Sequence, residues 1–174
     1  PYDDRDGNGV YEPDPDGDGV YGELEVTEEG DTTYAEDIPG ISGASQTLWT
    51  VYNDLDEGQN IGIYGAPSTG LEVQETYWAY ALANPLGSTV FKRVRLIYKG
   101  KVDTPNDAVV EEMYISQWSD PDLGTYTDDY VGCDIGLSFG YVYNGNRLDG
   151  VFNGIYNLAV PAGGYDFLQG PVDN

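Results

Sequence analysis

Histidine is absent from this chain of 174 residues, and cysteine occurs only once. Without histidine the chain cannot form a Ser-His-Asp or Cys-His nucleophile system, or the usual histidine-bearing zinc site. The lone Cys133 cannot close a disulfide within the chain, and we expect it to be a small buried apolar residue. We therefore interpret the protein as non-enzymatic.

Positive charge is almost as scarce, with seven Lys and Arg residues against 31 Asp and Glu and a formal net charge of −24. So acidic a chain is a poor ligand for nucleic acid, which proteins bind through clusters of Lys and Arg, and for anionic membrane surfaces. Its own like charges oppose compaction. Bound divalent cations would relieve that repulsion.

Long apolar runs are missing too. No stretch approaches the roughly 20 apolar residues of a membrane-spanning helix, and the chain opens on Pro-Tyr-Asp-Asp instead of a basic and then apolar leader. We therefore expect no membrane insertion, and a signal peptide that has been removed or was never included.

The residues present in excess are oxygen ligands, glycine and tyrosine. The 16 Tyr and 24 Gly favour strands and turns over helices. Composition changes abruptly near residue 38, because residues 3–37 hold 14 carboxylates with Arg5 as their only basic residue. We expect two parts, an acidic segment at residues 1–37 and a β-domain at residues 38–174.

Short runs of β-branched and aromatic residues follow, separated by Gly, Asn and Asp clusters. This pattern predicts an all-β fold, an antiparallel β-sandwich or jelly roll with an irregular N-terminal calcium-binding segment. Val94, Leu96 and Tyr98 are expected on one face of their strand, with Arg93 and Arg95 on the other. No segment shows helical periodicity over more than two turns. Strands are predicted at residues 48–52, 71–80, 89–99, 112–118, 137–143 and 151–158, and loops at 58–70, 105–107 and 120–134.

A ten-residue repeat opens the chain. Residues 4–13 and 14–23 both follow the pattern D-x-D-G-D/N-G-V-Y in their first eight positions. Side-chain oxygens at positions 1, 3 and 5 converge on one Ca²⁺ because the intervening glycine permits a tight turn, and position 7 adds a backbone carbonyl. The second copy fills the whole pattern with Asp14, Asp16, Asp18, the carbonyl of Val20, and Glu25.

The first copy departs from the pattern, since Pro15 occupies the place of the final glutamate. Its Asp4, Asp6 and Asn8 need a further ligand from Glu12, Asp14 or Asp16, so two ions can share ligands. Both loops resemble those of EF-hand, dockerin and thrombospondin type 3 repeats, and the last is most similar because no amphipathic helices flank them. The alternative is a solvated acidic linker without metal.

A second acidic stretch places five carboxylates within 15 residues, at Asp120, Asp122, Asp128, Asp129 and Asp134. One interpretation is a second calcium site that holds a long loop, and another is a solvated turn. A third is a pair of acid and base carboxylates for glycoside hydrolysis, which requires a defined separation across a cleft.

Five of the seven basic residues lie on or beside one predicted strand: Lys92, Arg93, Arg95, Lys99 and Lys101. They are expected to form a cross-strand ladder with Glu72 and Glu75. Alternatively, they bind the acidic segment of a neighbouring subunit, a head-to-tail contact that does not close and so makes a filament.

Three tryptophans, Trp49, Trp78 and Trp118, and the many tyrosines are candidates for a sugar-stacking platform. The alternative is that they form the core and rim of the sandwich.

Residues 37–171 resemble an uncharacterised β-domain of large secreted bacterial proteins that end in a type IX-like sorting domain. The resemblance is carried by D-I-P-G at 37–40, Q-T-L-W at 46–49, N-D-L-D at 53–56, G-L-E-V-Q at 70–74, S-Q-W-S-D-P-D-L-G at 116–124, D-D-Y-V-G-C-D at 128–134 and G-Y-V-Y-N at 140–144. It implies an exported surface or matrix protein and carries no known activity.

Together these features predict a non-enzymatic, calcium-binding, extracellular structural or adhesive module, with the subunit of a surface filament or matrix as its candidate role. The second hypothesis is a carbohydrate-binding module, and the third an acidic-pair glycoside hydrolase. The expected cofactor is Ca²⁺, and the expected partners are further copies of the chain or a glycan.

Overall fold

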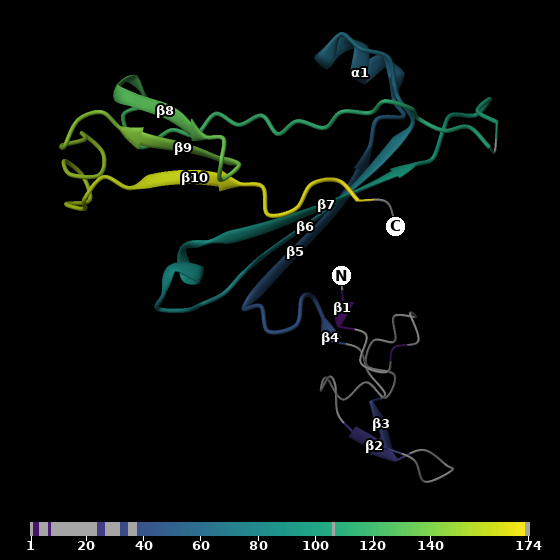
Figure 1. Ribbon diagram of the computed structural model, residues 1–174, viewed down its shortest axis with the longest axis horizontal. Helices are drawn as coiled ribbons and strands as arrows, with labels where there is room; N and C mark the ends of the chain where they lie inside the picture. Colours follow the sequence, from purple (N-terminus) through teal and green to yellow (C-terminus); the bar gives the residue numbers. More distant parts are fainter. Residues whose placement is uncertain are drawn as a thin grey trace. The chain divides into compact units, whose positions relative to one another are not determined.

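The computed structural model describes residues 2–3, 7, 24–26, 32–34, 38–105 and 107–172. These residues form mainly antiparallel strands with one α-helix, so the predicted all-β class is confirmed (Figure 1). The chain divides into two compact units, Pro1–Met113 and Tyr114–Asn174. The boundary expected between residues 37 and 38, which separates the acidic segment from the β-domain, is not the boundary between these two units. It stays a prediction. In the described ranges no helix is long and apolar enough to cross a membrane.

The first unit contains two short strand pairs and one larger sheet. β1 (Tyr2–Asp3) pairs with β4 (Ile38–Pro39), and β2 (Leu24–Val26) pairs with β3 (Thr32–Tyr34). The larger sheet has the order β5-β6-β7, with β5 at Gln46–Asn53, β6 at Leu71–Ala79 and β7 at Val90–Tyr98. The three predicted strands here are confirmed, and the turn between the last two contains the short 3-10 helix η1, Pro85–Ser88.

The register of this sheet separates two faces, because successive side chains of a strand point to opposite sides. Glu75 pairs with Thr50 on one side and with Val94 on the other. As predicted, Val94, Leu96 and Tyr98 lie on one face of the sheet, and Arg93 and Arg95 lie on the other face. We call the first the apolar face, which carries Leu48, Thr50, Tyr52, Leu71, Val73, Glu75, Tyr77, Ala79, Val90, Lys92, Val94, Leu96 and Tyr98. The mixed face carries Thr47, Trp49, Val51, Glu72, Gln74, Thr76, Trp78, Phe91, Arg93, Arg95 and Ile97.

The helix α1 (Glu57–Tyr64) lies where a glycine-rich loop was predicted. Asp56 caps its start by accepting a hydrogen bond from the backbone N–H of Gln59 at 3.0 Å. Gly65 ends it in the left-handed conformation, with φ of 68°, and donates its N–H to the carbonyl of Ile61. These two caps outweigh the helix-weakening glycines inside.

The second unit contains a three-stranded sheet of order β10-β9-β8, with β8 at Asp129–Asp134, β9 at Phe139–Asn144 and β10 at Ala162–Asp166. A short 3-10 helix, η2 (Tyr126–Asp128), precedes β8. β9 confirms the strand predicted at 137–143. β8 lies inside the predicted loop 120–134, and β10 was not predicted.

Two predicted strands and one predicted burial are wrong. Residues 112–118 are irregular and exposed. Residues 151–156 form consecutive turns and residues 157–158 are irregular, because Asp149 accepts hydrogen bonds from N–H groups that a strand would donate to a neighbouring strand. Cys133 is exposed rather than buried.

Candidate functional site

Most residues of the predicted N-terminal calcium loops lie outside the described ranges: Asp4, Asp6, Asn8, Glu12, Asp14, Asp16, Asp18 and Val20. Two described residues bear on the loops. Gly7 has φ of 77°, a conformation that favours glycine, in the middle of the first copy. Glu25 lies in β2 opposite Thr33, so a strand, not a helix, follows the second copy.

The acidic stretch of the second unit is spread over a loop and a strand. Within the described ranges no three His, Cys, Asp or Glu side chains gather as a group that could hold a metal ion. Asp128 accepts hydrogen bonds from the side-chain amides of Asn144 and Asn146, at 3.2 and 2.5 Å. Asp120 and Asp122 lie in the irregular segment before them. A calcium ion at this stretch stays a prediction.

Two further carboxylates of the stretch lie in β8. Asp129 Oδ2 accepts the N–H of Leu123 at 2.7 Å, whereas its Oδ1 is buried with no hydrogen-bond partner in the described part of the chain. Asp134 accepts the N–H of Leu137 at 3.1 Å and so closes the turn between β8 and β9. Each of these two carboxylates therefore accepts a hydrogen bond from a different backbone N–H group.

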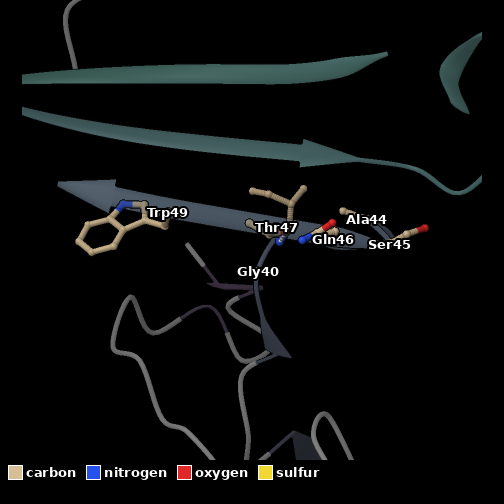
Figure 2. A pocket seen from close by; sticks show the side chains of 7 residues that line it. Gly40, Ala44, Ser45, Gln46, Thr47 and Trp49 are labelled. Carbon is tan, nitrogen blue, oxygen red and sulfur yellow. Dashed lines mark hydrogen bonds between the residues drawn. The ribbon is translucent and has the colours of Figure 1, made fainter. Parts of the chain in front are cut away.

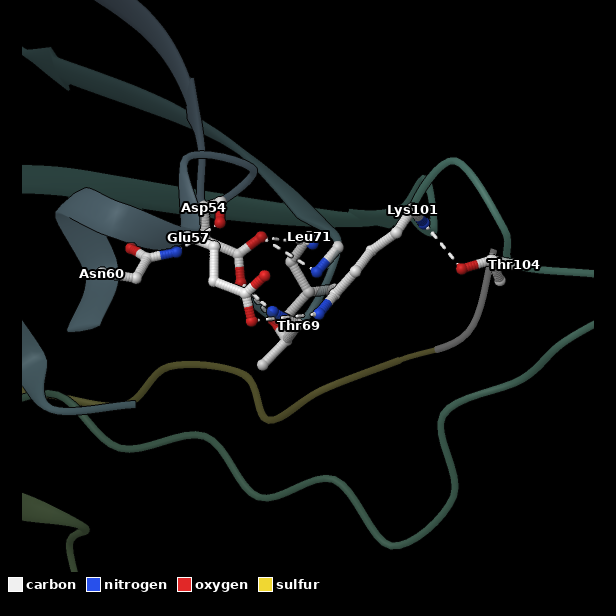
Figure 3. Close-up of polar contacts among 8 residues, drawn as sticks. Asp54, Glu57, Asn60, Thr69, Leu71, Lys101 and Thr104 are labelled. Carbon is white, nitrogen blue, oxygen red and sulfur yellow. Dashed lines mark hydrogen bonds and ion pairs between the residues drawn. The ribbon is translucent and has the colours of Figure 1, made fainter. Parts of the chain in front are cut away.

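Asp54 does the same at the end of β5 (Figure 3). Its carboxylate accepts the N–H and hydroxyl of Thr69, both at 2.5 Å, and the N–H groups of Gly70 and Leu71 at 3.0 and 2.9 Å. Burial acts to raise the pKa of Asp54, but the hydrogen bonds from Thr69, Leu71 and Gly70 outweigh it and lower the pKa. The side-chain amide of Asn60, from α1, bonds to the Asp54 carbonyl.

Asp149, which sequence analysis did not single out, is the strongest carboxylate cap. It is only 4% exposed, and it accepts the N–H groups of Thr125, Val151 and Phe152 at 2.7–2.8 Å. The hydrogen bond from Phe152, reinforced by Thr125 and Val151 against the opposing effect of burial, lowers the pKa of Asp149 to about 2. The Asp-Gly pair at 149–150 was the available signal, since Asp before Gly is typical of turns.

Glu75 lies at the centre of the apolar face and is 9% exposed. Lys92 Nζ approaches its carboxylate to 2.7 Å, and the hydroxyls of Tyr77 and Tyr52 donate to it at 2.7 and 3.2 Å. Burial acts to raise the pKa of Glu75, but the Lys92 and Tyr77 hydrogen bonds and the Lys92 charge outweigh it and lower the pKa. Burial likewise acts to lower the pKa of Lys92, and its bonds to Glu75 and Tyr77 raise it instead.

The predicted ladder of basic residues is confirmed at two positions. Lys92 pairs with Glu75, and Lys99 Nζ lies 3.8 Å from Glu72. Arg93 and Arg95 stand on the mixed face opposite Thr76 and Gln74, and neither forms an ion pair with any residue the structure describes.

Two of the three candidate tryptophans share the mixed face. Trp49 and Trp78 lie on neighbouring strands, and the ring of Trp78 stacks on Phe91 at 5.4 Å with an interplanar angle of 13°. A hollow of about 310 Å³ lies beside Trp49, lined by the Gly40–Gln46 turn and Thr47 (Figure 2). Trp118 belongs to the irregular part of the other unit.

Comparison of the chain with protein-family models, with curated proteins and with solved structures finds no match. The class that the structure defines is an all-β protein of two units, each with an antiparallel three-stranded sheet, whose loops are held by carboxylates. The resemblance to the secreted bacterial β-domain stays a hypothesis.

Proposed function

We propose that this protein is a non-enzymatic, extracellular structural or adhesive module whose acidic N-terminal segment binds Ca²⁺. The observation that carries the proposal is an arrangement of charge. Arg93 and Arg95 project from β7, an edge strand, without an acidic partner in the described ranges, while residues 3–37 of the same chain hold 14 carboxylates. The acidic segment of one copy can bind Arg93 and Arg95 of another, with Lys99 contributing just beyond the end of the strand.

Such a contact joins two different surfaces, so it repeats head to tail and produces a filament or matrix. An open sheet edge suits this role, and among the described residues β7 pairs with β6 on one side only. Extracellular placement follows from the resemblance to secreted bacterial domains.

Calcium would be held by the second copy of the repeat through Asp14, Asp16, Asp18, the Val20 carbonyl and Glu25, with Asp4, Asp6, Asn8 and Glu12 serving a second ion. The left-handed Gly7 supports a tight turn between the predicted ligands of the first copy. Bound ions would offset part of the net charge of −24 and let the segment adopt a fixed shape.

Three of the described carboxylates are unsuited to act as a general acid. Asp54, Glu75 and Asp149 all have lowered pKa values because N–H, O–H or ammonium donors hold their charged forms. A general acid near neutral pH requires a raised pKa instead.

We also propose that the two larger sheets pack as a sandwich. The apolar face exposes Leu48, Val90 and Val94, and apolar faces of this kind are stable when another layer covers them. Leu96→Asp and Val142→Asp should each unfold the protein, whereas Arg95→Asp on the mixed face should not.

Sedimentation velocity with Ca²⁺ tests the assembly. Wild-type protein should form higher oligomers as its concentration rises, and the double variant Arg93→Glu/Arg95→Glu should stay monomeric. Lys101→Glu/Arg147→Glu changes the net charge by the same amount at positions outside β7 and serves as the control. Addition of about 1 M NaCl, where the Debye length is about 3 Å, should also dissolve the oligomers. A wild type that stays monomeric at high concentration with Ca²⁺ would contradict the proposal.

Carbohydrate binding is the second candidate function, because aromatic side chains are exposed on faces of both larger sheets. It is compatible with an adhesive module.

A further inference from the structure

The strands β8, β9 and β10 form one sheet (Figure 1). Its register places four aromatic side chains one after another on one face. Phe139, Tyr141 and Tyr143 alternate along β9, and Tyr130 of β8 pairs with Tyr143. Successive ring centroids are 6.0, 6.1 and 5.9 Å apart, and successive ring planes differ by only 23°, 35° and 29°. We call these four residues the aromatic row.

Small residues on the neighbouring strands make room for the rings. A Cβ added to Gly132 would lie 2.5 Å from Cζ and Oη of Tyr141. A Cβ added to Gly164 or to Gly145 would run into the ring of Phe139 or Tyr130. The rings of Tyr130, Phe139 and Tyr141 therefore each lie against the backbone of a glycine.

Three of the four rings in the aromatic row are exposed. On the central strand β9, Val142 of the opposite face is 2% exposed, and its neighbours Gly140 and Asn144 are partly covered. Tyr141 and Tyr143 are 38% and 45% exposed, and Tyr130 is 58% exposed. A ligand can therefore reach most of the aromatic row.

Polar groups border the row. Asp134 and Asp166 pair with Phe139 from the two neighbouring strands, so they share its face. Carboxylates only accept hydrogen bonds, and the tyrosine hydroxyls both donate and accept. The ring faces are electronegative and attract C–H groups. A surface of ring faces bordered by acceptors matches a sugar, which offers C–H groups on its ring faces and hydroxyl donors on its edges.

Charge selects among the possible occupants. Asp134, Asp166 and the net charge of −24 disfavour an anionic glycan, an acidic peptide or the same face of a second copy. The row of four rings spaced about 6 Å apart suits an extended chain more than a single sugar. We infer that the aromatic row is a binding platform for a neutral polysaccharide. This inference rests on the adhesive role proposed above and names a neutral polysaccharide as the ligand of the adhesive module.

The test is binding of the full chain, with Ca²⁺ present, to insoluble cellulose and chitin and to a soluble neutral β-glucan by affinity electrophoresis. Wild-type protein should bind at least one of them, and 0.5 M NaCl should not weaken binding because the ligand is uncharged. Tyr141→Ala and Tyr143→Ala should each weaken binding about tenfold or more. Tyr165→Ala is the matched control, because Tyr165 is 45% exposed on the opposite face of the same sheet.

Two further variants separate binding from folding. Tyr141→Phe keeps the ring and should keep binding, whereas Gly132→Val keeps every ring but displaces that of Tyr141 and should lose binding. Arg93→Glu/Arg95→Glu, which abolishes the proposed assembly, should bind the polysaccharide as wild type does, so the two proposals fail separately. Binding to none of the neutral polymers, binding only to anionic ones, or an equal loss in Tyr165→Ala would overturn the inference.

Discussion

At the residue scale, carboxylates accept hydrogen bonds from backbone N–H groups, as backbone carbonyls do in helices and sheets. Asp54 and Asp149 each accept at least three hydrogen bonds, nearly all of them from backbone N–H groups of turns. Buried N–H groups require such acceptors, and an ionised carboxylate is among the strongest available. Part of the acidity of this chain is therefore structural, independent of any ion it binds.

The lowered pKa of Asp149 predicts acid sensitivity. Because its pKa is about 2 in the folded protein and 3.8 ordinarily, its stabilising effect is complete above pH 3.8 and is lost as the pH falls toward 2. Asp149→Asn should lower Tm by several degrees at neutral pH and flatten the dependence of stability on pH between about 4 and 2. Thermal melts across this range provide the measurement. Asp103→Asn, an exposed position, should behave as wild type.

The Glu75–Lys92 pair predicts that the protein loses stability at both low and high pH. Glu75, with a lowered pKa, loses its stabilising effect as the pH falls below its ordinary value of 4.5, and Lys92, with a raised pKa, loses its effect as the pH rises above 10.5. Lys92→Met should cost about 1 to 2 kcal/mol in the free energy of unfolding, a modest figure because the lysine side chain is 31% exposed. Urea melts of Lys92→Met and of the control Lys101→Met measure it, and equal stability would show that Tyr52 and Tyr77 alone satisfy Glu75.

At the element scale, the sequence predicts best where alternation is regular. The faces of β7 followed directly from the order of Val94, Arg95, Leu96 and the residues around them. Part of the aromatic row can be predicted from the sequence, since Phe139, Tyr141 and Tyr143 alternate along one strand. The glycines beside the rings, Gly132 and Gly164, come from other strands. Only the strand register shows that these glycines lie under the rings, and register was not available from the sequence.

Helix α1 was missed because two glycines masked a local signal. Asp56 followed three residues later by Gln59 is a helix-start pattern, yet Gly58 and Gly62 argue against a helix. The turns at 151–156 were missed for a related reason, since their apolar residues suggested a strand and Asp149 was not recognised as their cap. In both places a single capping carboxylate decided the local structure.

The ends of α1 give a paired prediction. Gly65 has φ of 68°, so Gly65→Ala should cost about 1 kcal/mol, because residues with a Cβ are strained there. Gly62 lies inside the helix with open space around it, so Gly62→Ala should stabilise by about 0.5–1 kcal/mol. Urea melts of the two variants should shift in opposite directions. A stabilising Gly65→Ala would mean that the helix continues past its cap.

At the scale of the whole molecule, charge is the dominant property. A chain with 31 acidic and seven basic residues folds against its own repulsion, and the described ion pairs use Lys92, Lys99 and Lys101. Further neutralisation has to come from bound cations or from a partner. This is why the calcium and assembly proposals belong together.

Calcium should therefore raise stability. At a Ca²⁺ concentration about 100 times Kd, one site that exists only in the folded protein adds about 2.7 kcal/mol, and Tm should fall when a chelator removes the ion. Asp16→Ala/Asp18→Ala should abolish the effect if the predicted loop register is right. Asp120→Ala/Asp122→Ala should reduce it only if the second acidic stretch also binds an ion. An unchanged Tm in chelator would contradict the proposal.

The carboxylate caps also set how fast individual amides exchange their hydrogens with solvent. The N–H groups of Thr69, Gly70 and Phe152 lie outside the strands, where rapid exchange with deuterium would be the ordinary expectation. Bound to Asp54 and Asp149, they should exchange as slowly as strand amides. Their spectral signals would then report, residue by residue, when each cap opens.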